Sequence, residues 1–207
     1  MDIKQAILLN NQAASLLESN RLSEALCVSC AAMEMFQKQR SSGEHVSFDG
    51  KGTIDQFMLA LGDFSSDDTN DDFVYERGVV LPLNVLDRTV ITPVLIFNCA
   101  LCHHLGARHC NDFATSQAFL SKANRLYEIA YSEQDHDFNT IFKFAIVNNV
   151  GVIHKELGSY EEAEACFDNL TSIMMIYTVS GENKYLQPVR GFWRNVLGNG
   201  RSIAPAA

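Results

Sequence analysis

The sequence predicts an all-α protein built from helical hairpins, and three observations support this prediction. Apolar residues recur at helical spacing through most of the 207 residues, of which 47% are apolar and 20% charged. The amphipathic stretches come in pairs with short breaks between them. Small residues also recur twelve positions apart, at Ala13 and Ala25 and again at Gly151 and Ala163. Antiparallel helices approach closely where one presents Gly or Ala, so this spacing indicates a repeated hairpin.

The first hairpin is expected at residues 3–38, followed by an insertion at 39–92. IKQAILLNNQAASLLES and LSEALCVSCAAMEMF are both amphipathic, and Asn20 and Arg21 interrupt them. In the insertion Ser, Gly and Asp accumulate around FVYERGVVLPLNVL, a β-branched and aromatic stretch. We expect one or two short strands there.

Helical pattern then returns to the end of the chain. Pro93 is typical of a first helical turn, and Gly106 of a helix end. Gly158 ends a later helix, and Ser159 with Glu162 matches a capping box that opens the next one. The remaining predicted elements, all in one domain of residues 1–207, are a second hairpin at 93–133, a third at 138–180, a capping helix at 187–198 and a flexible tail at 199–207.

The repeat is most complete in VNNVGVIHKELGSYEEAEACF, residues 147–167, where Phe167 and Leu170 share a helix face with Ala163. This order of small, glycine, aromatic and alanine positions resembles the tetratricopeptide repeat (TPR), over roughly residues 3–38 and 93–198. The doubled asparagine resembles the repeat variant of kinesin light chains. The resemblance implies a right-handed α-α superhelix of about three hairpins, with a concave groove that binds peptides.

Asparagines recur in register on the face that would line this groove. In each copy one lies two residues before the small residue, and in two copies a second asparagine precedes it. Asn is a weak helix former, so the recurrence needs a reason. Its amide donates and accepts at once, which suits the backbone of an extended peptide. The candidate groove residues are Asn10, Asn11, Asn98, His104, Asn148, Asn149 and Lys155. The alternative is that these amides bond to a neighbouring helix or loop inside the fold.

We therefore expect a non-catalytic protein–protein interaction adaptor that binds an extended peptide or partner segment. The alternative is a structural subunit that docks through its outer or end surfaces and uses the asparagines for internal packing. The insertion can also fill the groove as an internal pseudo-ligand, because FVYERGVVLPL is extended and apolar. In that case the groove is occluded.

Charge and motifs argue against other function classes. A net charge of −9 and a pI near 5.0 disfavour nucleic acid and anionic membranes as partners. No secretory pattern or uninterrupted membrane-length apolar run is present, so we expect a cytoplasmic protein whose six cysteines are buried, reduced thiols. Cys99-Ala100-Leu101-Cys102-His103 matches a haem-attachment string, but it falls on a packing face. We expect no cofactor, no metal and no enzymatic activity.

Overall fold

The computed structural model describes residues 3–41, 72–85, 87–134, 140–179 and 190–199. These residues are helical except for segment 72–85 and the short connections, so the all-α prediction is confirmed. The described residues cluster into two compact units. The first unit contains α1 to α4 with residues 76–85, and the second contains residues 72–75 with α5 to α7.

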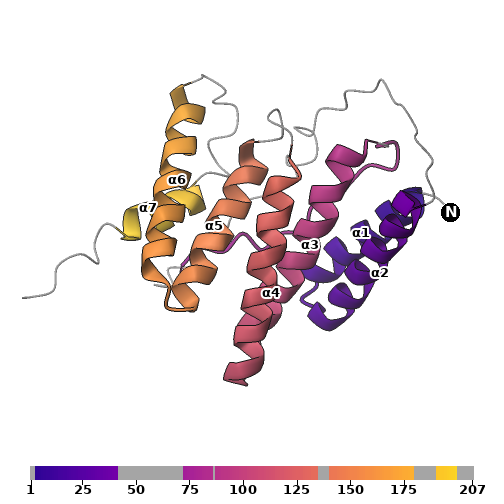
Figure 1. Ribbon diagram of the computed structural model, residues 1–207, viewed down its shortest axis with the longest axis horizontal. Coiled ribbons are helices and arrows are strands. Elements are labelled where there is room, and N and C mark those ends of the chain that lie inside the picture. The colour runs from indigo at the N-terminus through magenta and orange to yellow at the C-terminus, as the bar shows by residue number, and fades with distance from the viewer. Residues whose placement is uncertain (1–2, 42–71, 86, 135–139, 180–189, 200–207) are drawn as a thin grey trace, which may run out of the picture. The chain divides into compact units, whose positions relative to one another are not determined.

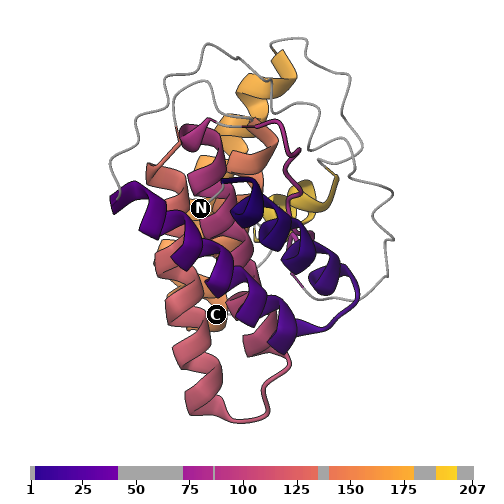
Figure 2. The same cartoon turned by 90° about the vertical axis from the view of Figure 1, so that its right-hand side faces the viewer.

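In the first unit, α1 (Ile3–Glu18) and α2 (Leu22–Ser41) form one hairpin, and α3 (Arg88–Arg108) and α4 (Phe113–Ser132) form another. Asn20 makes the tight turn between α1 and α2 with a φ of 55°, a left-handed conformation that Asn tolerates better than most residues. Both α1 and α2 pack against α3, as Figures 1 and 2 show. Ala13 and Ala25 are fully buried, in line with the close helix approach that their spacing indicates.

The start of α3 differs from the prediction. The helix begins at Arg88, so Pro93 lies inside it and not in its first turn. Asp87 is the reason, because its side chain accepts a hydrogen bond from the Thr89 N–H at 2.9 Å and caps the helix. By length and composition α3 is the one described helix able to cross a membrane, but 89% of its apolar window is buried inside the protein.

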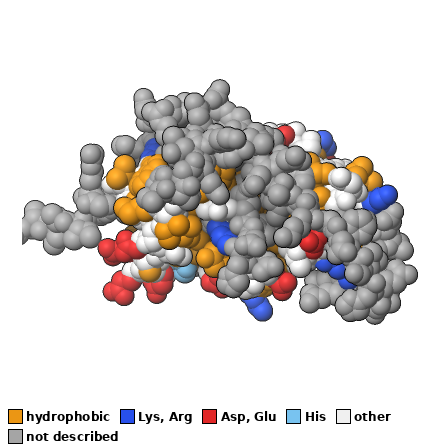
Figure 3. Space-filling model, turned by 90° about the horizontal axis from the view of Figure 1, so that it is seen from above, with side chains coloured by type: hydrophobic (Ala, Val, Ile, Leu, Met, Phe, Trp, Pro, Cys, Tyr) orange, Lys and Arg blue, Asp and Glu red, His pale blue; other side chains and the backbone are white. Residues whose placement is uncertain are grey.

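In the second unit, α5 (Thr140–Glu156) and α6 (Tyr160–Val179) form a hairpin, and α7 (Arg190–Asn199) packs against both. Gly158, with a φ of 79°, lies just beyond the end of α5, as the sequence predicts. A Cβ on Gly151 would lie 2.9 Å from the ring of Phe167, so the predicted pair of small and aromatic residues is in direct contact. Acidic side chains gather on the outer face of α6 (Figure 3), where Glu161, Glu162 and Glu164 are exposed.

Residues 39–41 and 88–92 of the predicted insertion belong to α2 and α3, and segment 72–85 between these helices has neither helix nor strand. The strands expected there are therefore absent from these described residues, although the segment is well buried. Tyr75 and Leu81 are almost fully buried, as are Val74 and Val79. The predicted tail at 199–207 lies outside the described residues except for Asn199, the last residue of α7.

The cysteines follow the prediction only in part. Cys99 and Cys102 are buried in α3, where burial raises the pKa of the Cys99 thiol to about 12. Cys27 is exposed, and the other three cysteines are partly exposed. The expectation that all six are buried is therefore wrong, because α2 and α6 each present one side to solvent and Cys110 lies in the connection between α3 and α4.

Candidate functional site: two asparagine clamps

The first candidate site lies in the first unit, where three asparagines hold the backbone of segment 72–85. We call Asn10 and Asn11 of α1 with Asn98 of α3 the first clamp. The Asn98 amide accepts from the Val79 N–H and donates to the Val79 carbonyl, both at 2.8 Å. Asn11 does the same for Leu81, accepting at 2.8 Å and donating at 2.6 Å. Each of these asparagines thus satisfies both backbone groups of one residue.

Asn10 completes the first clamp by linking its members. Its Nδ2 donates to the Val79 carbonyl at 3.0 Å and to Asn11 Oδ1 at 3.2 Å. Its Oδ1 accepts from Asn98 Nδ2 at 2.8 Å. Asn10 therefore joins the two asparagines that grip Val79 and Leu81 into one network.

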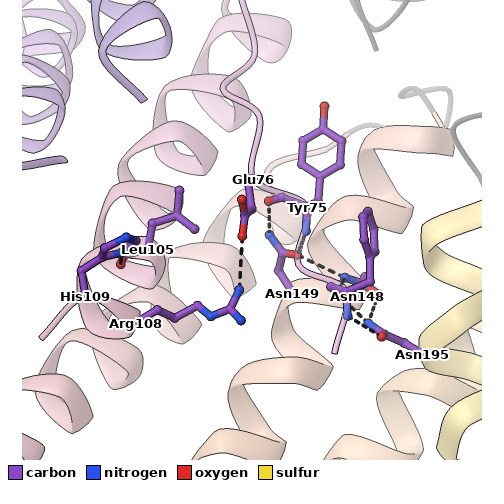
Figure 4. A network of polar contacts seen from close by, with 9 residues as sticks. Tyr75, Glu76, Leu105, Arg108, His109, Asn148, Asn149 and Asn195 are labelled. Atoms are coloured by element: carbon purple, nitrogen blue, oxygen red, sulfur yellow. Dashed lines mark hydrogen bonds and ion pairs between the residues drawn. The ribbon is translucent and has the colours of Figure 1, made fainter. Parts of the chain in front are cut away.

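The second unit contains an equivalent arrangement, shown in Figure 4. We call Asn148 and Asn149 of α5 with Asn195 of α7 the second clamp. Asn149 accepts from the Tyr75 N–H at 2.8 Å and donates to the Tyr75 carbonyl at 3.0 Å. Asn195 accepts from the Phe73 N–H and donates to the Phe73 carbonyl, both at 2.7 Å.

Asn148 plays the linking part that Asn10 plays in the first clamp. Its Nδ2 donates to the Phe73 carbonyl at 2.9 Å and to Asn149 Oδ1 at 3.2 Å. Its Oδ1 accepts from Asn195 Nδ2 at 2.7 Å. The two clamps therefore share one pattern: a doubled asparagine on the first helix of a hairpin, and a single asparagine on the helix that follows that hairpin.

Each clamp holds two residues that are two apart in sequence. In extended chain, alternate residues turn their N–H and C=O groups to the same side, so a row of amides can meet every second residue. Burial makes these bonds strong contributors, because an unpaired buried N–H or C=O costs about 1–3 kcal/mol. Asn98, Asn148 and Asn149 are fully buried, and Asn10 and Asn195 nearly so. The hydrogen bonds of the two clamps thus account for all six asparagines, which are weak helix formers inside helices.

An ion pair lies next to the segment in each unit. In the second unit Lys155 Nζ lies 2.8 Å from Asp72 Oδ1. In the first unit Arg108 Nη1 lies 3.2 Å from Glu76 Oε1 (Figure 4). These pairs are partly exposed, so each contributes at most about 1 kcal/mol.

Close packing fixes the segment along its length. In the first unit Gly78 lies directly against α1, at Ala14. In the second unit the Phe73 ring lies over Gly191 of α7, and the rings of Tyr75 and Phe192 stack with centroids 6.3 Å apart. The backbone hydrogen bonds would be the same after a shift of two residues, so these side-chain contacts define the register.

The residues expected in the groove thus fall into two groups: those that contact segment 72–85, and His104, which packs inside the first unit. All five predicted asparagines bond to segment 72–85, and Lys155 pairs with Asp72. His104 is different: it is fully buried, with its ring edge-on to Tyr127 of α4 at 6.1 Å. Burial and the nearby Arg108 lower the pKa of His104 to about 3, so its ring is neutral.

Sequence reasoning missed Asn195. The search rule required a small residue two positions after the asparagine, and Leu197 stands there. A looser rule, one asparagine on each helix that begins a repeat, would have found it. No group of three or more potential metal ligands lies together among the described residues.

Comparison of the chain with protein-family models, with curated proteins and with solved structures found no match.

Proposed function

We propose that this protein is a non-catalytic interaction adaptor, and that the two asparagine clamps are its binding elements for an extended polypeptide in a TPR-like groove. One observation supports this most directly: Asn11, Asn98, Asn149 and Asn195 each pair with both backbone groups of a single residue. Such pairing accepts any residue with a free N–H, which is what recognition of a peptide backbone needs.

The protein's own segment 72–85 occupies these clamps, so the binding elements are self-occupied. A partner then binds only by replacing part of the segment. Leu81 is tied to α3 through residues 82–87, and such a short tether gives an effective concentration on the order of millimolar. The partner's apparent dissociation constant is its intrinsic value divided by the small fraction of molecules whose clamp is free. Weakening the segment should therefore strengthen partner binding.

A proline substitution tests this without altering the helices. Val79→Pro removes the N–H that donates a hydrogen bond to Asn98. Val80→Pro is the control: it makes the same chemical change at a residue that is 48% exposed and takes no part in the clamp bonds. In affinity capture from a cell lysate, Val79→Pro should enrich specific partners several-fold over wild type and over Val80→Pro. Adding Asn11→Ala and Asn98→Ala should abolish that gain.

Equal capture by wild type, Val79→Pro and the combined variant would refute the proposal. Circular dichroism on every variant controls for folding. The combined variant is the necessary comparison, because exposed apolar surface in a loosened protein captures partners without any clamp.

A structural subunit is the second candidate function, and a separate observation favours it. Large apolar side chains are exposed on α6 and α7 of the second unit, among them Tyr160 at 68%, Ile176 at 70% and Leu197 at 67%. Exposed apolar groups of this size are common at docking surfaces. In this reading the clamps serve internal packing only. Ile176→Glu should then abolish capture while Val79→Pro leaves it unchanged, the reverse of the pattern expected for the adaptor.

A further inference from the structure

The clamp amides bond to the held segment only through its backbone, so they cannot by themselves choose one extended sequence over another. Selectivity must come from points where the side chain of the bound segment meets the helices. In the first unit one such point is Gly78, the residue just before Val79, where the segment lies directly against α1. A Cβ built on Gly78 would lie 2.7 Å from the Cα of Ala14, 2.8 Å from its Cβ and 3.2 Å from Leu17 Cδ1.

The obstacle at this point is backbone and cannot move aside cheaply. Ala14 lies in the middle of α1, is buried, and follows closely on Asn10 and Asn11, which are bonded to the segment. Shifting α1 away from Gly78 would lengthen those hydrogen bonds. Gly78 does not have the positive φ that glycine alone adopts readily. Glycine is therefore needed for space and not for its backbone freedom.

The neighbouring residues complete a short pattern. Val79 and Leu81, whose backbones the first clamp holds, are buried, whereas Val80 between them is exposed. A bound segment therefore needs glycine, then a buried apolar residue, then a free position, then a second buried apolar residue. Proline is excluded from both buried positions, because each donates its N–H to an asparagine.

We propose that the partner of the first clamp is an extended segment of another protein with the pattern glycine–apolar–any–apolar, and that contact with Ala14 rejects every residue but glycine at the first position. This inference rests on the proposed adaptor function and adds the class of sequence that is recognised.

The structure favours a separate partner over a second copy of this chain. Only residues 82–86 stand between Leu81 and Asp87, the cap of α3. The six Cα–Cα steps from Leu81 to Asp87 span at most about 22 Å. A second copy could offer its segment only by bringing its own α3 within that distance of the clamp, whereas a partner with a free segment has no such restriction.

A peptide-binding experiment tests the inference. The probe is a fluorescent peptide of residues 76–85, ERGVVLPLNV, made also with Gly78→Ala and, as the matched control, with Val80→Ala. The receptor is the full chain carrying Val79→Pro, which weakens its own segment. A methyl group forced into a packed contact reduces affinity by about 5-fold to 150-fold. We expect that loss for the Gly78→Ala peptide, and a change of less than about twofold for Val80→Ala.

The outcomes separate this inference from the proposed function. Equal binding of the native and Gly78→Ala peptides would overturn the glycine requirement and leave the adaptor function standing. A second receptor is the full chain carrying Gly78→Ala. If neither peptide binds to either receptor, both the glycine requirement and the adaptor function are overturned. The choice of a separate partner would be overturned if the wild-type chain forms a dimer in analytical sedimentation and the native peptide dissociates that dimer.

Discussion

Replacing Asn98 and replacing Asn10 should have different effects on stability, although both side chains are buried in the same clamp. In Asn98→Ala the Val79 N–H loses its acceptor and Asn10 Oδ1 loses its donor. Two orphaned buried groups cost about 1–3 kcal/mol each, or about 2–6 kcal/mol together. Alanine returns at most about 0.7 kcal/mol through its higher helix propensity. The expected net loss is about 1.5–5 kcal/mol.

Asn10→Ala removes as many hydrogen bonds but leaves every remaining clamp atom with at least one partner; only one of the two Asn98 Nδ2 hydrogens loses its acceptor. The Val79 carbonyl keeps Asn98, Asn98 Nδ2 keeps that carbonyl, and Asn11 Oδ1 keeps the Leu81 N–H. The expected loss is therefore only about 1–2 kcal/mol, from the lost bonds and the smaller side chain. Asn124→Ala on α4 is the control, because Asn124 only donates to Glu128 on an exposed helix surface, a bond worth about 0.2–0.5 kcal/mol.

Urea unfolding followed by circular dichroism measures all three variants against wild type. The expected order of destabilisation is Asn98→Ala, then Asn10→Ala, then Asn124→Ala. If Asn10→Ala proves as costly as Asn98→Ala, orphaned backbone groups do not control clamp energetics and the reasoning fails. If Asn98→Ala matches the exposed control, the first clamp contributes nothing to stability.

Three further outcomes follow from the structure. Asn195→Ala should destabilise the second unit by about 1.5–5 kcal/mol for the same reason as Asn98→Ala, and fluorescence of Trp193, the only tryptophan, reports on that unit directly. Folding lowers the pKa of His104, so the stability that its neutral ring contributes is present above about pH 6.5 and is lost as the pH falls toward about 3. Between pH 6.5 and 5, the free energy of unfolding of the wild type should therefore fall by up to about 1.4 kcal/mol per pH unit more than that of His104→Leu. Gly151→Ala should cost about 1–3 kcal/mol in thermal or urea unfolding, because the added methyl meets the Phe167 ring, and a neutral result would show that α5 and α6 can separate freely.

Much of the site could be predicted because it follows from periodicity and amide chemistry. Asn11, Asn98 and Asn149 share one position relative to a small residue, so register alone selects them. FVYERGVVLPL is an extended apolar stretch between helical regions, and the structure places its backbone on these amides. The hypothesis of an internal pseudo-ligand required no more than these two facts.

The rest depends on three-dimensional context that spacing does not contain. His104 lies on α3, which is buried on almost all sides, so helical projection cannot tell which neighbour its ring meets. The start of α3 was obscured by Pro93, which is stronger as a local signal than the capping Asp87. Asn195 stands on a helix that lacks the small residue of the other copies. In each case tertiary packing decides the outcome.

The doubled asparagine makes sense if its first member orients the clamp. A buried amide can present either its oxygen or its nitrogen to Val79 N–H, and only the oxygen can accept. Asn10 Oδ1 selects the correct orientation, because it accepts from Asn98 Nδ2 and so turns Asn98 Oδ1 toward the Val79 N–H. Asn148 stands in the same relation to Asn195.

Asn10→Ala should therefore loosen the grip on Val79 even though every remaining clamp atom keeps a partner. Loss of about 1 kcal/mol of orienting energy corresponds to roughly fivefold faster local opening, measurable as faster hydrogen exchange of the Val79 amide by NMR. The Tyr75 amide is the control, because it is held by Asn149 of the second clamp, whose bonds do not involve Asn10. Faster exchange at Val79 alone supports an orienting role; equal acceleration at both amides would show that Asn10 acts only by supporting the segment as a whole.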